Sequence, residues 1–66
     1  MKIDEKKLNL AMADAGMTLK DVCTSSGISD TAFRAIRQGK TNPRPATLGK
    51  IAKALNVNVK EIICND

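Results

Sequence analysis

Hydrophobic residues recur at helical spacing along the chain, and short stretches rich in glycine, proline and asparagine separate the periodic segments. The clearest case lies in the last third of the sequence, where apolar residues follow an i, i+3, i+4, i+7 pattern: Leu48, Ile51, Ala52 and Leu55. That spacing places all of them on one face of an α-helix. No segment alternates in the manner of a half-buried strand, so the pattern predicts an all-α protein.

The first predicted helix runs from Lys2 to Ala15. Asp4 is its expected N-cap, and Gly16 is expected to end it. The residues that helical spacing directs toward the core are Leu8, Ala11, Met12 and Ala15. Charged and polar residues lie between them, so we expect an amphipathic helix that serves as scaffold.

A helix-turn-helix pattern occupies residues 18–39. Thr18 and Asp21 can form a capping box at the start of one helix, and Gly27 can end that helix in the left-handed conformation. Ser29 can cap the next helix, so only a short turn separates the two. We expect the helices to cross near a right angle and to bury a shared set of side chains: Val22, Cys23, Phe33 and Ile36.

The third predicted helix, which Gly39 ends, has two different faces. Its core side carries Ala32, Phe33 and Ile36, and its outer side carries Thr31, Arg34 and Gln38. A polar and partly cationic outer face suits a helix that enters a DNA major groove, where donors and acceptors read the base edges. The simpler interpretation is a solvated amphipathic helix in a small bundle.

Two further helices are predicted after this pattern. Pro45 suits the first position of a fourth helix, and Asn56 can end it in the left-handed conformation. Asn58 can open a short fifth helix with Glu61 as its capping-box partner. The sequence therefore predicts five helices in one domain, residues 1–66.

A chain of 66 residues has little interior. A domain of this size buries only about 60% of the surface that its unfolded chain exposes, so marginal stability is expected unless it pairs with a second copy. Ile62 and Ile63 give the last helix more apolar surface than one short turn needs. They are candidates for the contact in a homodimer; alternatively, both simply cover the domain.

The formal charge of +4 is unevenly distributed, because residues 31–60 contain seven Lys or Arg and no acidic residue. A basic half suggests a polyanionic partner, although proteins that bind no anion can share this balance. With one Phe and no Trp or Tyr, the chain lacks the aromatic residues on which single-strand binders stack bases. Composition therefore favours duplex over single-stranded nucleic acid.

Residue types that catalysis and metal binding require are scarce. The chain has no His, and its two cysteines, Cys23 and Cys64, lack CxxC spacing, so we expect no metal site, no cofactor and no thiol nucleophile. Cys23 is interpreted as a small core residue and Cys64 as half-buried or free, with a disulfide as the less favoured alternative. No set of catalytic groups is evident, so we expect neither an enzyme nor a small-molecule ligand. Early charges and the lack of a long apolar run argue against a signal peptide or membrane span, which makes the cytoplasm the expected location.

Taken in order, these features resemble the Cro and phage-repressor (XRE-type) helix-turn-helix family over nearly the whole chain. The matching segments are Cys23 with Gly27 four residues later, the GIS turn, Phe33 with Ile36, then GKTNP, and TLGKIAKALNV leading to VKEII. The resemblance implies a compact five-helix, lambda-repressor-like domain in which helices 2 and 3 form the DNA-binding unit. Family members mostly regulate transcription and bind two-fold DNA sites as homodimers.

Roles for individual residues follow from the resemblance and from the polarity of the helix ends. The residues expected to contact bases of double-stranded DNA are Asp30, Thr31, Arg34, Ala35 and Gln38. Those expected to contact phosphates are Thr18, Lys20, Ser29, Arg37, Lys40, Thr41, Asn42 and Arg44. Arg34 can pair bidentately with guanine, and Asp30 can accept from a cytosine amino group. A carboxylate in the first turn of a helix also stabilises the helix dipole without any ligand, which is the alternative for Asp30.

Three residues depart from the family pattern. Leu19 replaces the Gln often found at the start of the second helix, which removes an expected DNA contact. Ser26 stands where an apolar residue is usual, and Arg44 stands where a capping Ser or Asp is usual. The latter two predict a less stable domain.

The function expected from these observations is repressor-like regulation of transcription, with the third helix inserted in the major groove. The alternative is a protein-binding module, antitoxin-like or adaptor, that keeps the fold and presents Ile62, Ile63 and the basic face to another protein. A steep loss of duplex affinity with added salt would favour the first interpretation. A salt-insensitive complex with a protein would favour the second.

Overall fold

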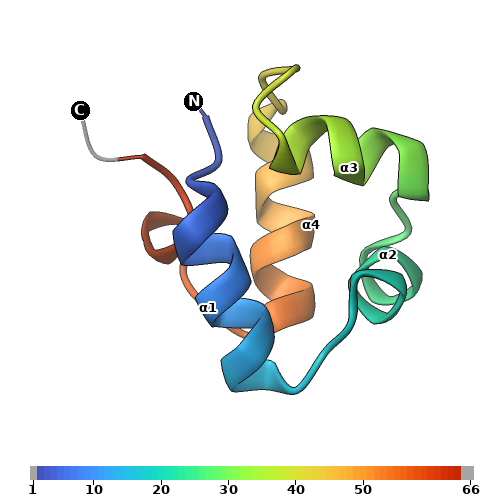
Figure 1. Ribbon diagram of the computed structural model, residues 1–66, viewed down its shortest axis with the longest axis vertical. Coiled ribbons are helices and arrows are strands. Elements are labelled where there is room, and N and C mark those ends of the chain that lie inside the picture. The colour runs from blue at the N-terminus through green and yellow to red at the C-terminus, as the bar shows by residue number, and fades with distance from the viewer. Residues whose placement is uncertain (1, 65–66) are drawn as a thin grey trace.

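The computed structural model describes residues 2–64, within which four α-helices are followed by a single turn of 3₁₀ helix. The elements are α1 (Glu5–Ala15), α2 (Leu19–Ser26), α3 (Asp30–Arg37), α4 (Pro45–Leu55) and η1 (Val59–Glu61). Figure 1 shows α1 and α4 side by side, with α3 crossing near the start of α4. In this view α2 lies on the side of α4 opposite α1, below α3. The all-α prediction is confirmed for the described residues. The predicted single domain also includes residues 1, 65 and 66, which lie outside them.

The predicted fifth helix is wrong as an α-helix. Two i to i+3 hydrogen bonds form there, from Glu61 N–H to the Asn58 carbonyl at 2.9 Å and from Ile62 N–H to the Val59 carbonyl at 3.1 Å. The Glu61 carboxylate does accept from the Asn58 N–H at 2.8 Å, so its predicted capping contact is present. A backbone bridge that begins directly after this turn leaves no room for a second turn, which is why the segment stays at three residues.

That bridge also explains why α1 begins at Glu5 and not at Lys2 as predicted. Ile3 pairs antiparallel with Ile63, and the Cys64 N–H donates to the Lys2 carbonyl at 3.0 Å. The segment before α1 is therefore extended. The predicted N-cap is correct, because Asp4 Oδ1 accepts from the Lys7 N–H at 3.1 Å.

Three of the α-helices end in the same hydrogen-bond pattern. After α1, the Met17 N–H donates to the Met12 carbonyl at 3.0 Å, and equivalent bonds follow α3 and α4. This six-to-one bond belongs to the Schellman motif, which requires a left-handed residue. That residue is Gly16 after α1, Gly39 after α3 and Asn56 after α4, with φ of 66°, 77° and 57°. The predicted ends at Gly16 and Asn56 are confirmed, and Gly39 terminates the third helix as expected.

The core consists of apolar side chains from the four α-helices, from Ile3 before α1 and from Ile62 after η1. Phe33, Leu8, Leu48, Ile51, Ile62 and Val22 are fully buried. The α4 stripe predicted from the sequence is buried in full. Ala15 and Ala32, which were expected in the core, are exposed. Ala15 lies in the last turn of α1, where the chain turns away at Gly16, and the buried stripe of α3 is only as wide as Phe33 and Ile36.

Burial bears on the sequence interpretations of Ile62, Ile63 and the two cysteines. Ile62 is fully buried and covers the domain, which is the alternative that the sequence left open, whereas Ile63 is half-buried; the dimer contact stays a prediction. Cys23 is a buried core residue with a free thiol, as interpreted from its position, and Cys64 is free and exposed.

No described helix is long and apolar enough to cross a membrane. Within residues 2–64 no group of three or more His, Cys, Asp or Glu could hold a metal ion.

Candidate nucleic-acid interface

The corner between α2 and α3 is built by local hydrogen bonds and one left-handed residue. Thr18 and Asp21 form the predicted capping box, with the Thr18 N–H donating to Asp21 Oδ2 at 2.9 Å and the Asp21 N–H donating to Thr18 Oγ1 at 3.2 Å. At the other end of α2, Gly27 has φ of 76°. Ser29 Oγ then accepts from the Ala32 N–H at 3.2 Å and begins α3. Both helices of the corner therefore start where the sequence predicted.

Ser26 has a role that the sequence analysis missed. Its hydroxyl accepts from the Ile28 N–H at 3.4 Å and donates to the Cys23 carbonyl at 3.5 Å, which joins the end of α2 to the turn. Ile28 itself packs against the core. A serine side chain can accept from the backbone N–H two residues later, here that of Ile28, so the signal was present in the sequence. Ser26 thus supports the turn, whereas the sequence interpretation considered it only as a residue that makes the domain less stable.

The outer surface of α3 carries most of the residues predicted to contact bases. Asp30, Thr31, Arg34 and Gln38 are exposed, and Ala35 is half-buried. Phe33 and Ile36 hold the opposite side of the helix in the core. The structure therefore brings the predicted base-contacting residues to one polar surface, on a helix whose inner side is fixed by packing.

Asp30 lies beside a buried thiol of the neighbouring helix. Burial raises the pKa of the Cys23 thiol, and the Asp30 carboxylate raises it further, while Arg34 opposes this effect. The thiol therefore stays protonated and behaves as a small core group.

Two predicted phosphate contacts, Thr18 and Ser29, already serve as helix caps. Each side-chain oxygen accepts a backbone N–H, but a hydroxyl keeps its own O–H for donation. Both residues are exposed, as is Lys20 in the first turn of α2. A phosphate oxygen could thus receive a hydroxyl hydrogen bond at the positive end of either helix without loss of the cap.

The connector between α3 and α4 presents four further candidates. Its exposed residues are Lys40, Thr41, Asn42 and Arg44. Pro43 is buried among them, which fixes the middle of the connector and was missed in the sequence analysis. Arg44 precedes α4 without a side-chain capping bond, as its departure from the family pattern predicted. In Figure 1 this connector leaves the end of α3 and returns to the start of α4.

Arg37 differs from the other predicted phosphate contacts. Its side chain is only 31% exposed, and its Nε lies 3.8 Å from Glu5 Oε2 on α1. No other ion pair is present within residues 2–64. Arg37 thus faces α1, whereas the connector residues face solvent.

Comparison with known proteins agrees with this geometry. No curated protein and no solved structure matches the chain. A family model described as Cro/C1-type HTH DNA-binding domain matches residues 7–64, which include the whole of α2, α3, α4 and η1. The resemblance drawn from the sequence is therefore confirmed, and the chain belongs to the Cro/C1-type helix-turn-helix family of DNA-binding domains.

Proposed function

We propose that the chain is a repressor-like, sequence-specific regulator of transcription that inserts α3 into the DNA major groove. The observation that carries this proposal is the exposed polar surface of α3, held outward by Phe33 and Ile36 in the core. A major groove admits one α-helix, and its base edges differ in their pattern of donors and acceptors. Discrimination between sequences would then come from α3.

Within this proposal Arg34 is the main specificity residue. Its guanidinium is exposed one turn into α3, and a guanidinium can donate two parallel hydrogen bonds to guanine O6 and N7. Asp30 would accept from a cytosine amino group, and Thr31 and Gln38 would supply adaptable donors and acceptors. Ala35 is half-buried, so its methyl group would contact a thymine methyl only where the helix approaches the base pair closely.

Affinity would come mainly from phosphate contacts on both sides of α3. Lys20, Thr18 and Ser29 lie at the helix starts, and the exposed connector residues lie beyond the other end of α3. Cations that neutralise phosphates release counterions, so duplex affinity would fall steeply as salt is added. Arg37 would act more weakly, because Glu5 already lies beside it.

We further propose that the chain binds DNA as a homodimer. Ile63 is the remaining dimer-contact candidate, since Ile62 is buried inside the domain. A two-fold protein reads a two-fold DNA site, with half-sites about one helical turn of DNA apart or a multiple of that spacing.

Selection of bound duplexes from a random pool tests sequence-specific binding and two-fold symmetry in one experiment. We expect an enriched sequence with two-fold symmetry and a half-site spacing near 10 base pairs or a multiple of it. A pool that shows no enrichment over its starting composition would contradict sequence-specific binding. An enriched site without symmetry would contradict the homodimer while leaving base recognition by α3 in place.

A further inference from the structure

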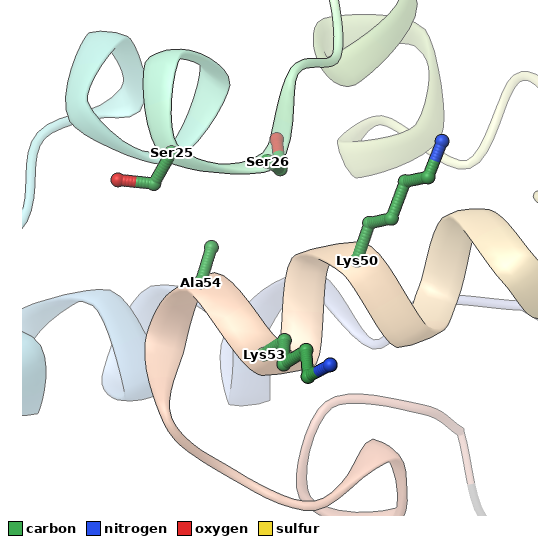
Figure 2. Close-up of a pocket in the computed structure, with 5 residues that line it drawn as sticks. All are labelled: Ser25, Ser26, Lys50, Lys53 and Ala54. Atoms are coloured by element: carbon green, nitrogen blue, oxygen red, sulfur yellow. The ribbon is translucent and has the colours of Figure 1, made fainter.

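Two hollows in the surface of α4 share the same pair of lysines, Lys50 and Lys53. One hollow, of about 410 Å³, lies between α4 and the last residues of α2, and its lining adds Ser25, Ser26 and Ala54. Figure 2 shows the two serines across this hollow from Lys50 and Ala54. The other, of about 480 Å³, lies between α4 and the segment that follows it. Together we call the two lysines and both hollows the α4 lysine face.

The lining of the α4 lysine face combines positive charge with an apolar floor. Its polar groups are the two ammonium groups, serine hydroxyls and the Asn58 amide, and neither hollow is lined by a carboxylate. The apolar part of the second hollow is made by Ala46, Gly49, Ala52, Val57 and Val59. Both lysines are exposed, and neither forms an ion pair with another residue of the described chain. The face thus offers unpaired cations one helical turn apart beside room for small apolar side chains.

The α4 lysine face lies at the opposite end of α2 from two of the proposed phosphate contacts, whereas a third, Ser29, follows Ser26 by three residues. Ser25 and Ser26 are the last residues of α2, whereas Thr18 and Lys20 lie at its start. A helix of eight residues is about 12 Å long, so the hollow lies at the far end of α2 from those phosphate candidates.

A second copy of the chain is a poor occupant of this face. In a two-fold dimer the same patch meets itself, so the lysines of one copy would approach the lysines of the other. Like charges that meet across an interface disfavour association. A negatively charged partner can form ion pairs with these lysines, whereas a second copy would bring like charges together.

We infer that the α4 lysine face is a docking site for an acidic segment of another protein that carries small apolar side chains. Carboxylates one helical turn apart would pair with Lys50 and Lys53, while apolar side chains between them enter the two hollows. This inference goes beyond DNA binding. A duplex on α3 and an acidic protein segment on α4 could then be held by one chain at the same time.

The test uses a fluorescein-labelled helical peptide of glutamate, leucine and alanine, with glutamates one helical turn apart. Its anisotropy is measured against the full chain and against the double variant Lys50→Glu/Lys53→Glu. The matched control is Lys6→Glu/Lys60→Glu, which makes the same change in net charge at two exposed lysines outside both hollows. Gly49→Gln is a third variant, because a Cβ at Gly49 meets nothing within 4 Å and the added side chain would fill the second hollow.

We expect the Lys50/Lys53 variant to bind the peptide about tenfold more weakly than the matched control, because two ion pairs become repulsive contacts. Gly49→Gln should weaken peptide binding without a change in duplex affinity. Equal peptide binding by the two charge variants would overturn the inference, since net charge alone would then explain the attraction. A larger loss of duplex affinity in the Lys50/Lys53 variant than in the control would also overturn it, by making these lysines DNA contacts. The inference would also be overturned if the Lys50/Lys53 variant, without peptide or DNA, had a different sedimentation coefficient from the parent chain, because the face would then be an interface between copies.

Discussion

The guanidinium of Arg37, the last residue of α3, lies against the carboxylate of Glu5, the first residue of α1, with Nε 3.8 Å from Oε2. This separation is too long for a hydrogen bond, and Arg37 Nε has no hydrogen-bond partner within residues 2–64 although it is buried. The contact is therefore ionic attraction between two helices that are far apart in sequence. It places a negative charge beside a cation that the sequence analysis predicted to contact phosphate.

Replacement of Glu5 by Gln should strengthen DNA binding without regard to sequence. Loss of this carboxylate leaves the charge of Arg37 free to attract phosphates, and we expect duplex affinity to rise about twofold to threefold at low salt and less at high salt. Stability should fall by no more than about 1 kcal/mol, because the pair is partly exposed. Asp14→Asn is the control, since it removes an exposed carboxylate elsewhere on α1. Equal strengthening by both variants would show that net charge, and not the position of Glu5, sets the effect.

Substitution by alanine should lower the stability of the fold at Gly27 and raise it at Gly49. An added Cβ meets nothing within 4 Å at either position, but Gly27 has φ of 76° and Gly49 lies inside α4. The left-handed conformation disfavours alanine by about 1–2 kcal/mol, so Gly27→Ala should be destabilised by that amount. Gly49→Ala should be stabilised by about 0.5–1 kcal/mol, because alanine is the better helix former.

Denaturant unfolding of both glycine variants provides the measurement. The m-values should match that of the parent chain, so that the midpoints report stability alone. If Gly27→Ala were as stable as the parent chain, the turn between α2 and α3 would tolerate another conformation, and the orientation of α3 would not depend on this residue.

The helix caps and the helix-turn-helix corner could be predicted because their signals are local. Thr18, Asp21 and Gly27 lie within ten residues of one another, and the bonds they form follow from residue type and spacing. The exposed side of α3 followed in the same way, since Phe33 and Ile36 define its buried stripe. The proposed base and phosphate contacts remain predictions.

The features that the sequence did not predict depend on contacts between distant segments. The bridge between Ile3 and Ile63 joins residues 60 positions apart, and helical periodicity contains no information about such a pairing. It shortened α1 and limited η1 to one turn. Ala15 and Ala32 were misplaced for a related reason: spacing gives the direction of a side chain around a helix, but not whether another element lies over it.

The capping box of α2 should make stability depend on pH through Asp21. Hydrogen bonds from the Thr18 backbone and side chain lower the pKa of the Asp21 carboxyl below its ordinary value of 3.8. A carboxyl with a lowered pKa stabilises the fold fully above its unfolded value, and this contribution is lost as pH falls through the lower folded value. Asp21→Asn should therefore differ most from the parent chain at neutral pH, with the difference shrinking in acid.

Thermal unfolding over a series of pH values measures this contribution. Thr18→Ala is the informative control, because it removes the side-chain cap, worth about 0.5–2 kcal/mol, yet keeps the backbone N–H that bonds to Asp21. Thr18→Ala should thus lower stability and retain part of the acid sensitivity. If Asp21→Asn and the parent chain lost stability in parallel on acidification, the capping box would not be the source of the pH dependence.

Substitution of Arg34 should change how well the protein discriminates between DNA sequences, whereas substitution of Lys40 should change its affinity for all DNA sequences. Arg34→Ala should cost about 1–3 kcal/mol on the selected duplex and relax the preference at one base position, because an exposed guanidinium on α3 would contact a base edge. Lys40→Ala should weaken selected and scrambled duplexes alike and reduce the salt slope by about one, since an exposed lysine in the connector would contact a phosphate. Titration of both duplexes at several salt concentrations measures the two effects together. An equal loss on selected and scrambled duplex for Arg34→Ala would remove Arg34 from base recognition and leave α3 without its main specificity residue.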